Sequence, residues 1–292
     1  MIRKEILLSN GETISYHEQG SGSKTLVLIH GNSSSSVYYK PLFERLPKNL
    51  RVIAPDLRGF GNSSYINSFD SLKELASDVN ELLELLKVKS FDVVGWSLGG
   101  GVAMELVLMN KNANKLILVA STTHYGYPLY QKDSLNQPII GKAYLTKEQM
   151  AKDPVQVLPL LKVIETQNIE MMKSIYNAGI YLVNKPTEED QILYAEESLK
   201  QRCLVDADWA ISTFNLSDKN NGYMQGNGQI NNIINDTLHI LGDRDLMVPE
   251  FMLEQNIEAI KNSTVIRYEN CAHSPFVDKP EEITKDLLEF IK

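Results

Sequence analysis

The chain has 292 residues, which is enough for one large domain or two small ones. Hydrophobic residues make up 43% of it and charged residues 23%, a balance typical of folded globular proteins and not of disordered or fibrous ones. The formal net charge is -8, and no cluster of Lys or Arg is present, so the sequence argues against a nucleic-acid partner.

Targeting and metal-binding signals are also missing from the sequence. No run reaches the roughly 18 apolar residues that a membrane-spanning helix needs, and residues 1–20 contain no apolar stretch of signal-peptide length. Cys203 and Cys271 lie far apart without metal-ligand neighbours, so neither a disulfide framework nor a zinc site is expected. We therefore expect a cytoplasmic protein without metal, cofactor or membrane partner, and the oligomeric state stays open, with a homodimer as one option.

The first elements indicate a sheet. Residues 3–17 alternate apolar and polar side chains around Asn10-Gly11, which is a strong hairpin signal. Leucines recur at helical spacing across residues 72–86. Strands buried on both faces are predicted by apolar, β-branched runs at 25–30, 50–54, 91–95, 115–120, 237–241 and 263–268. Alternation of such strands with helices predicts an α/β fold with a mostly parallel sheet flanked by helices.

One long interval interrupts this alternation. About 115 residues separate the strands ending near 120 and starting near 237, too many for an ordinary connection. We interpret residues 122–235 as an inserted helical cap, with 1–121 and 236–292 as the core, and residues 217–235 as the returning loop. The interval holds eight of the thirteen tyrosines, which could line an apolar pocket, although packing is the commoner role for each one: Tyr125, Tyr127, Tyr130, Tyr144, Tyr176, Tyr181, Tyr194 and Tyr223.

A glycine-flanked serine follows the predicted strand at 91–95. Ser97 has Gly95 two residues before it and Gly99 two residues after it, and residues 102–109 beyond predict an amphipathic helix. A tight strand-to-helix turn needs small residues at those two positions, and it raises the serine hydroxyl above the sheet beside a helix N-terminus. The motif in this setting predicts that Ser97 is a nucleophile.

A serine hydroxyl needs a base to accept its proton. His17 and His239 lie in predicted strands, where a structural role is expected, and His124, at the start of the insertion, is a candidate for contact with substrate. His273 lies in a loop between the last predicted strand and a terminal helix at 281–291, and such loops form active sites in parallel sheets. We predict that His273 is the base.

The histidine in turn needs a carboxylate to orient it. Asp243 and Asp245 both follow the strand at 237–241, and Asp245, deeper in the loop, is the better candidate, while Asp243 is expected to make turn contacts. The order Ser97, Asp245, His273 differs from the orders in the two main protease classes and agrees with that of α/β-hydrolases.

Two backbone groups and two side chains complete the expected site. The loop after the early strand places the N–H of Asn32 opposite that of Leu98, which gives two donors for an oxyanion. Trp96 and Val248 flank the nucleophile and the acid loop, and we assign them to substrate binding.

These motifs resemble the α/β-hydrolase superfamily, in its branch of small esterases, lactonases and perhydrolase-like enzymes with a helical cap. The matching segments cover nearly the whole chain apart from the cap: HGN (30–32), APDLRGFGNS (54–63), GWSLGGG (95–101), GDRDLMVP (242–249) and the loop around His273. The resemblance implies the same triad and oxyanion donors. It assigns no catalytic role to the DLRG stretch at 56–59.

Departures from related families narrow the function. Haloalkane dehalogenases and epoxide hydrolases carry aspartate where this chain has Ser97, and lipases with an HGGG loop fit less well because only Gly31 is present. The expected activity is hydrolysis of a small-molecule ester or lactone, and lactones of acylated homoserine are a special case if the Asn32 side chain binds a substrate oxygen. The alternative is a ligand-binding receptor, a cofactor-free oxygenase or a perhydrolase on the same fold.

Overall fold

The computed structural model describes residues 2–292, and its centre is an eight-stranded sheet. The strand order is β1-β2-β4-β3-β5-β6-β9-β10. The strands are β1 (Ile2–Leu7), β2 (Thr13–Gln19), β3 (Thr25–Ile29), β4 (Arg51–Pro55), β5 (Phe91–Trp96), β6 (Ala113–Val119), β9 (Asp236–Gly242) and β10 (Ser263–Tyr268). The first two form the predicted antiparallel hairpin, β2 is antiparallel to β4, and the remaining pairs are parallel. The predicted fold class is confirmed.

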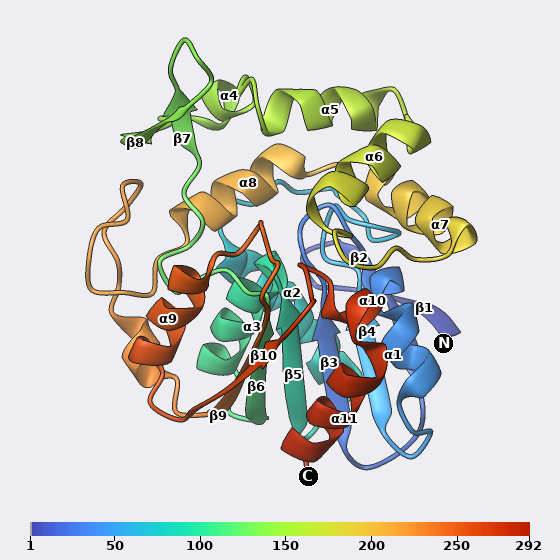
Figure 1. The fold of residues 1–292 in the computed structure, drawn as a ribbon. Helices are drawn as coiled ribbons and strands as arrows, with labels where there is room; N and C mark the ends of the chain where they lie inside the picture. Colours follow the sequence, from blue (N-terminus) through green and yellow to red (C-terminus); the bar gives the residue numbers. More distant parts are fainter. Residues whose placement is uncertain (1) are drawn as a thin grey trace.

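Helices cover both faces of the sheet (Figure 1). Alternate residues of a strand point to opposite faces, and in β5 Val93 belongs to the core under α2 and α3, whereas Val94 belongs to the core under α1 and α11. Both faces of β5 are therefore dry, which explains its continuous apolar run. The prediction that residues 263–268 form a strand buried on both faces was wrong, because β10 lies at the edge of the sheet and is partly exposed. The helices outside the insertion are α1 (Lys40–Arg45), α2 (Leu72–Leu85), α3 (Leu98–Met109), α9 (Glu250–Ala259), α10 (Pro275–Asp278) and α11 (Pro280–Phe290), with a 3₁₀ turn η1 (Ser36–Tyr39).

Helix α3 is not amphipathic, so that prediction was wrong. Residues 98–107 are all buried. The face turned away from the sheet is covered by α2 and, at Gly101, by Phe214 of the inserted segment. A covering element from so distant a part of the chain leaves no local signal in residues 102–109.

The segment between β6 and β9, called the insertion below, lies over the end of the sheet where β5 runs into α3 (Figure 1). It contains α4 (Lys147–Met150), α5 (Val157–Glu165), α6 (Ile169–Gly179), α7 (Glu188–Leu199), α8 (Leu204–Thr213), a 3₁₀ turn η2 (Gln229–Asn232), and a short hairpin of β7 (Tyr130–Lys132) and β8 (Pro138–Ala143). The hairpin is largely exposed, so its sequence lacks the apolar pattern of a core strand. A small core of its own, which includes Leu129, Met150 and Leu204, holds the insertion together.

Within residues 2–292, every helix is too short or too polar to cross a bilayer. Cys203 and Cys271 are both buried, and neither forms a disulfide.

Candidate active site

Ser97 occupies a sharp turn between β5 and α3. Its backbone has φ 54° and ψ -121°, a conformation that side-chain-bearing residues rarely adopt. The turn is held by the Ser97 N–H, which donates to Val119 O at 3.0 Å, and by the Ser97 carbonyl, which accepts from Gly100 N at 3.0 Å and Thr122 N at 3.1 Å. Neighbouring parallel strands thus fix a strained position and leave the hydroxyl partly exposed.

The flanking glycines are required by close backbone contacts. A Cβ on Gly95 would overlap the Gly99 carbonyl oxygen, and a Cβ on Gly99 would overlap the Ile29 carbonyl oxygen. Gly31 is also tight, because its Cβ would lie 3.0 Å from the Ser97 Cβ. Glycine is needed at these positions because the strand and the helix approach each other closely, as the motif predicts.

His273 and Asp245 form a buried hydrogen-bonded pair. The distance from His273 Nδ1 to Asp245 Oδ2 is 2.9 Å, and their side chains are 4% and 0% exposed. The other carboxyl oxygen of Asp245 accepts the N–H groups of Met247 at 2.8 Å and Val248 at 2.9 Å. The carboxylate is therefore fixed by its own loop and points one oxygen at the imidazole, which orients the ring.

Trp96 contacts His273 and does not line the cavity into which Ser97 and His273 open. Its indole N–H donates to the carbonyl of His273 at 2.9 Å, and the two ring centroids are 5.6 Å apart. Trp96 is 2% exposed and also packs against Phe276. The structure thus places this residue, which the sequence assigned to substrate binding, behind the histidine.

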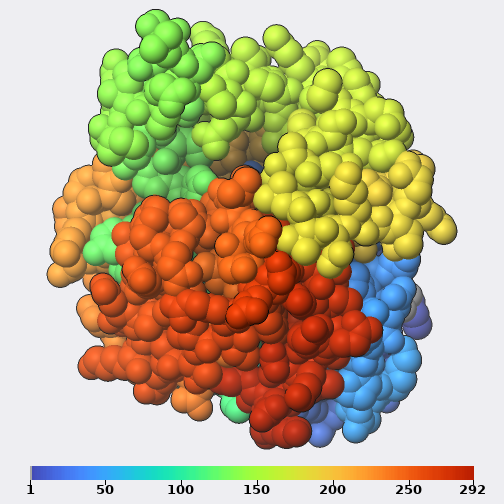
Figure 2. Space-filling view, viewed as in Figure 1, coloured from blue at the N-terminus to red at the C-terminus, as the bar shows by residue number. Residues whose placement is uncertain are grey.

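Ser97 and His273 open into one cavity of about 390 Å³ beneath the insertion. Asn32 and Val248 line it too, so four of the predicted site residues meet there. Figure 2 shows a hollow between the insertion, coloured green to yellow, and the orange segment that follows β9. Most of the remaining wall is apolar and comes from the insertion: Leu129, Val155, Pro159, Leu160, Met172, Ile175, Ile180 and Ile211.

The Ser97 hydroxyl forms no hydrogen bond to the His273 ring among the described residues. Both groups face the same cavity, and Trp96, the residue before Ser97, contacts the His273 ring. Such hydrogen bonds are often long in unliganded enzymes and shorten when substrate binds.

Two backbone N–H groups beside Ser97 are free to bind an anion. Within residues 2–292, neither Asn32 N nor Leu98 N donates a hydrogen bond to the protein. Leu98 is the first residue of α3, so its N–H also lies at the positive end of the helix dipole. The pair is suited to stabilising negative charge on a carbonyl oxygen.

The side chain of Asn32 is committed to the insertion. Its Nδ2 donates to Asp208 Oδ1 at 2.8 Å, and its Oδ1 accepts from Gln201 Nε2 at 2.8 Å and from Ser33 N at 2.9 Å. These contacts leave its amide oxygen unavailable as a hydrogen-bond acceptor for substrate, and one amide proton stays free.

The other histidines sit in structural settings. His17 Nδ1 pairs with Ser36 Oγ at 2.8 Å, and His239 Nε2 pairs with Ser263 Oγ at 2.9 Å. Burial lowers the pKa of His239 to about 4. His124 contacts Asn256 Oδ1 at 3.2 Å and does not line the cavity, so the structure gives it no substrate contact.

Sequence reasoning did not anticipate two polar groups of the cavity wall, because Asp208 on α8 contributes a buried carboxyl and Thr122 after β6 contributes a hydroxyl without a partner. Tyr127, one of the tyrosines considered for a pocket, lines the cavity and donates its hydroxyl to Met247 O at 3.0 Å. An aspartate in the apolar run of residues 207–211 was the one signal that the sequence offered for Asp208. Of the eight tyrosines in the insertion, Tyr127 and Tyr176 line the cavity and the other six do not.

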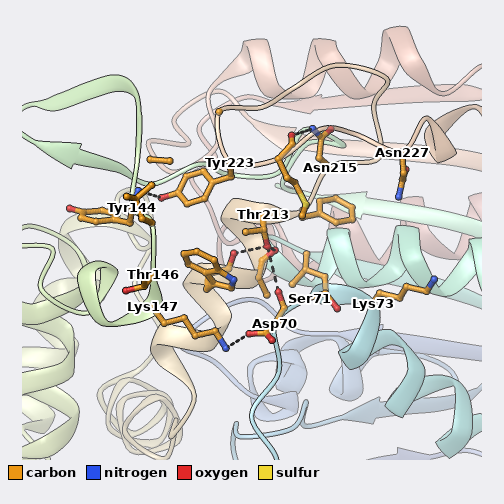
Figure 3. Close-up of a pocket in the computed structure, with 18 of the residues that line it drawn as sticks. Asp70, Ser71, Lys73, Tyr144, Thr146, Lys147, Thr213, Asn215, Tyr223 and Asn227 are labelled. Atoms are coloured by element: carbon orange, nitrogen blue, oxygen red, sulfur yellow. Dashed lines mark hydrogen bonds and ion pairs between the residues drawn. The ribbon is translucent and has the colours of Figure 1, made fainter.

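A larger groove of about 890 Å³ lies elsewhere, at the seam between the insertion and α2 (Figure 3). Figure 3 shows Lys147 of the insertion pointing at Asp70 before α2, and their ion pair measures 2.6 Å. Tyr144 and Tyr223 lie on the insertion side of this groove. It contains none of the predicted site residues, so the smaller cavity is the candidate active site despite its size.

Metal ligation finds no support in the described part of the chain. Residues 2–292 contain no cluster of three or more His, Cys, Asp or Glu side chains placed to hold a metal ion.

Comparisons with known proteins identify the family and similar folds. A model described as "Alpha/beta hydrolase family" matches residues 26–286. A pimeloyl-[acyl-carrier protein] methyl ester esterase of Vibrio vulnificus is 26% identical over 277 residues, which cover 94% of this chain and 96% of the relative. An esterase from Exiguobacterium antarcticum has a similar structure, with a TM-score of 0.76, 24% identity and 99% coverage of both chains. The structure of Est816, described as an N-acyl homoserine lactone degrading enzyme, gives a TM-score of 0.71 at 19% identity, with 98% of this chain and 100% of that one covered.

Proposed function

Because the chain belongs to the alpha/beta hydrolase family, we propose that it is a serine hydrolase that cleaves carboxylic esters or lactones through an acyl-enzyme intermediate. The observation that carries the proposal is the 2.9 Å bond between His273 and Asp245 beside the strained turn of Ser97, in a cavity lined by both Ser97 and His273. The esterase relative and the esterase structure support it.

The first half of the reaction forms the acyl-enzyme. Ser97 Oγ attacks the carbonyl carbon while His273 Nε2 accepts the hydroxyl proton. The N–H groups of Asn32 and Leu98 stabilise the negative oxygen of the tetrahedral intermediate, and each such donor is worth on the order of 10²–10³ in rate. His273 then gives the proton to the leaving alkoxide oxygen, which departs as an alcohol, or stays attached to the acyl chain in a lactone.

The second half releases the acid. Water attacks the acyl-enzyme carbonyl and loses a proton to His273, and the collapse of the second intermediate returns that proton to Ser97 Oγ. Asp245 stays ionised throughout and stabilises the imidazolium. Its two backbone N–H bonds to Met247 and Val248 hold it in place for this task.

The cavity supports a small, largely neutral substrate. Its wall is mainly aliphatic and aromatic, and a volume of about 390 Å³ lies within the usual range of small-molecule sites. We assign Val248 to this wall. We propose further that residues 122–235 act as a cap on a core of residues 1–121 and 236–292, because the insertion supplies most of the cavity wall.

The test is covalent labelling combined with kinetics. A fluorophosphonate probe is expected to modify Ser97, located by peptide mass spectrometry, and Ser97→Ala is expected to lose labelling and at least about 10³-fold of p-nitrophenyl acetate hydrolysis. Ser174→Ala is the matched control, because Ser174 is exposed and bonds only to Glu170 O of its own helix at 2.8 Å. Hydrolysis at the parent rate by Ser97→Ala, or failure of the probe to label the parent protein, would overturn the proposal in favour of a ligand-binding protein.

A further inference from the structure

Asp208 on α8 is the single acidic side chain among the described residues that line the cavity. It is 8% exposed, and its surroundings are chiefly the apolar residues of the insertion. A carboxyl group in such a place costs free energy unless a partner satisfies it. Its retention in the wall of a substrate cavity therefore calls for a partner.

The protein satisfies only one of the two carboxyl oxygens. Oδ1 accepts from Asn32 Nδ2 at 2.8 Å, whereas Oδ2 receives no hydrogen bond from residues 2–292. No described Lys or Arg forms an ion pair with Asp208. A like charge acts on it from the carboxylate of Asp153 before α5, whose own ion pair is with Lys132 at 2.9 Å. Burial, and to a lesser degree this like charge, raises the pKa of Asp208 to about 7.

The location of Asp208 relates it to the reacting carbonyl. Asn32 connects the two, since its backbone N–H is the proposed oxyanion donor and its side chain holds Asp208. A substrate whose carbonyl oxygen lies at the Asn32 N–H therefore has its next few atoms within reach of the free oxygen of Asp208. Above its raised pKa Asp208 is ionised and that oxygen is an acceptor, so it favours a donor on the substrate.

We propose that Asp208 is a specificity-determining residue that selects esters and lactones carrying a hydroxyl or N–H group on the second or third carbon of the acyl chain, where the carbonyl carbon is the first. This inference rests on the proposed hydrolase function. A buried acceptor left unpaired discriminates strongly against the substrate that lacks the donor. A substrate with a free carboxylate at the same place is disfavoured, because it meets Asp208 as a like charge.

A purely structural role for Asp208 predicts a different result. If the residue only tethers Asn32, its replacement misplaces the oxyanion donor and slows every ester equally. If it binds a substrate donor, its replacement slows the donor-bearing ester more. The ratio of two kcat/KM values separates these cases, and it also cancels the intrinsic reactivities of the esters.

The experiment compares methyl 3-hydroxybutanoate with methyl butanoate at pH 8, where Asp208 is mainly ionised. In Asp208→Asn, the new amide oxygen can still accept from Asn32, and its NH₂ group then takes the place of the free oxygen and opposes a substrate donor. The preference for the hydroxy ester, measured as the ratio of kcat/KM values, is expected to fall about ten-fold or more relative to the parent. Asp218→Asn is the control for loss of one negative charge, because Asp218 is exposed, and its ratio is expected to match that of the parent. The rate of fluorophosphonate labelling at Ser97 reports whether each variant keeps its folded site.

Each outcome has a defined meaning. A ten-fold fall in the ratio, with labelling retained, supports the inference. An unchanged ratio, or equal losses on both esters, overturns it and leaves the hydrolase proposal standing. Failure of the parent protein to cleave either ester or to react with the probe overturns both.

Discussion

Replacing Asp208 with asparagine is expected to change how the stability of the protein depends on pH. The carboxyl lies in the cavity wall with one hydrogen bond and no cation beside it, so its ionised form is poorly solvated in the folded state. Burial raises its pKa from 3.8 to about 7. Asparagine has nearly the same shape and does not titrate, so the substitution isolates the ionisation.

Proton linkage gives the sign and the size of the change in the free energy of unfolding with pH. Between the ordinary pKa and the raised one, the folded protein holds a proton that the unfolded chain has lost, so the free energy of unfolding falls as pH rises. One pKa unit corresponds to about 1.4 kcal/mol. From pH 5 to pH 8 this single group removes about 2–3 kcal/mol of stability from the parent protein, and none from Asp208→Asn.

Urea unfolding at pH 5 and pH 8 measures this effect. The difference in the free energy of unfolding, Asp208→Asn minus parent, is expected to grow by about 2–3 kcal/mol at the higher pH, because all other titrating groups cancel in the subtraction. Asp218→Asn, at an exposed position, is expected to show no comparable change. A difference that stays constant to within about 0.5 kcal/mol would refute the reasoning, since it would mean that Asp208 is well solvated in the folded protein.

Two other substitutions test the site and its support. Asp245→Asn is expected to lower kcat for p-nitrophenyl acetate by about 10⁴, because the amide no longer stabilises the imidazolium or the required tautomer. The control Asp243→Asn is expected to keep a rate near that of the parent. Equal losses in the two variants would contradict the assignment of the acid. Gly99→Ala is expected to destabilise the fold by about 3 kcal/mol or more in urea unfolding, because the new Cβ overlaps a backbone carbonyl oxygen of β3. Gly179→Ala is the control, because its new Cβ would lie 3.4 Å from the nearest atom, an ordinary contact distance. Its stability is expected to be unchanged or up to about 1 kcal/mol higher. Similar behaviour of the two alanine variants would count against the packing argument.

The sequence predicted the core because its signals there are local. Buried parallel strands need continuous apolar runs, and a sharp strand-to-helix turn needs glycine on both sides of Ser97. Both requirements fall within a few consecutive residues. The loops of Asp245 and His273 could be placed for a related reason, since each directly follows a strand and the carboxyl ends of parallel strands meet at one edge.

The cavity wall could not be predicted because its contacts join distant segments. Asp208 and Asn32 are 176 residues apart, and nothing in either neighbourhood shows that they meet. Trp96 illustrates the same limit at short range. Its position before the nucleophile suggested the substrate side, but the alternation of β5 and its bond to the His273 carbonyl place the indole behind the histidine.

The insertion also fixes the loop that carries one of the proposed oxyanion donors. Ser33, next to Asn32, has φ 51°, a backbone strain of order 1–3 kcal/mol for a residue other than glycine. Its carbonyl accepts hydrogen bonds from Ser198 Oγ at 2.6 Å and from the Tyr176 hydroxyl, and Gln201 holds the neighbouring Asn32 side chain. Because these donors come from α6, α7 and the segment after α7, the position of the Asn32 N–H depends on the packing of the insertion. We infer that the insertion shapes the reaction in two ways, since it forms the cavity wall and holds one of the groups that would stabilise the transition state.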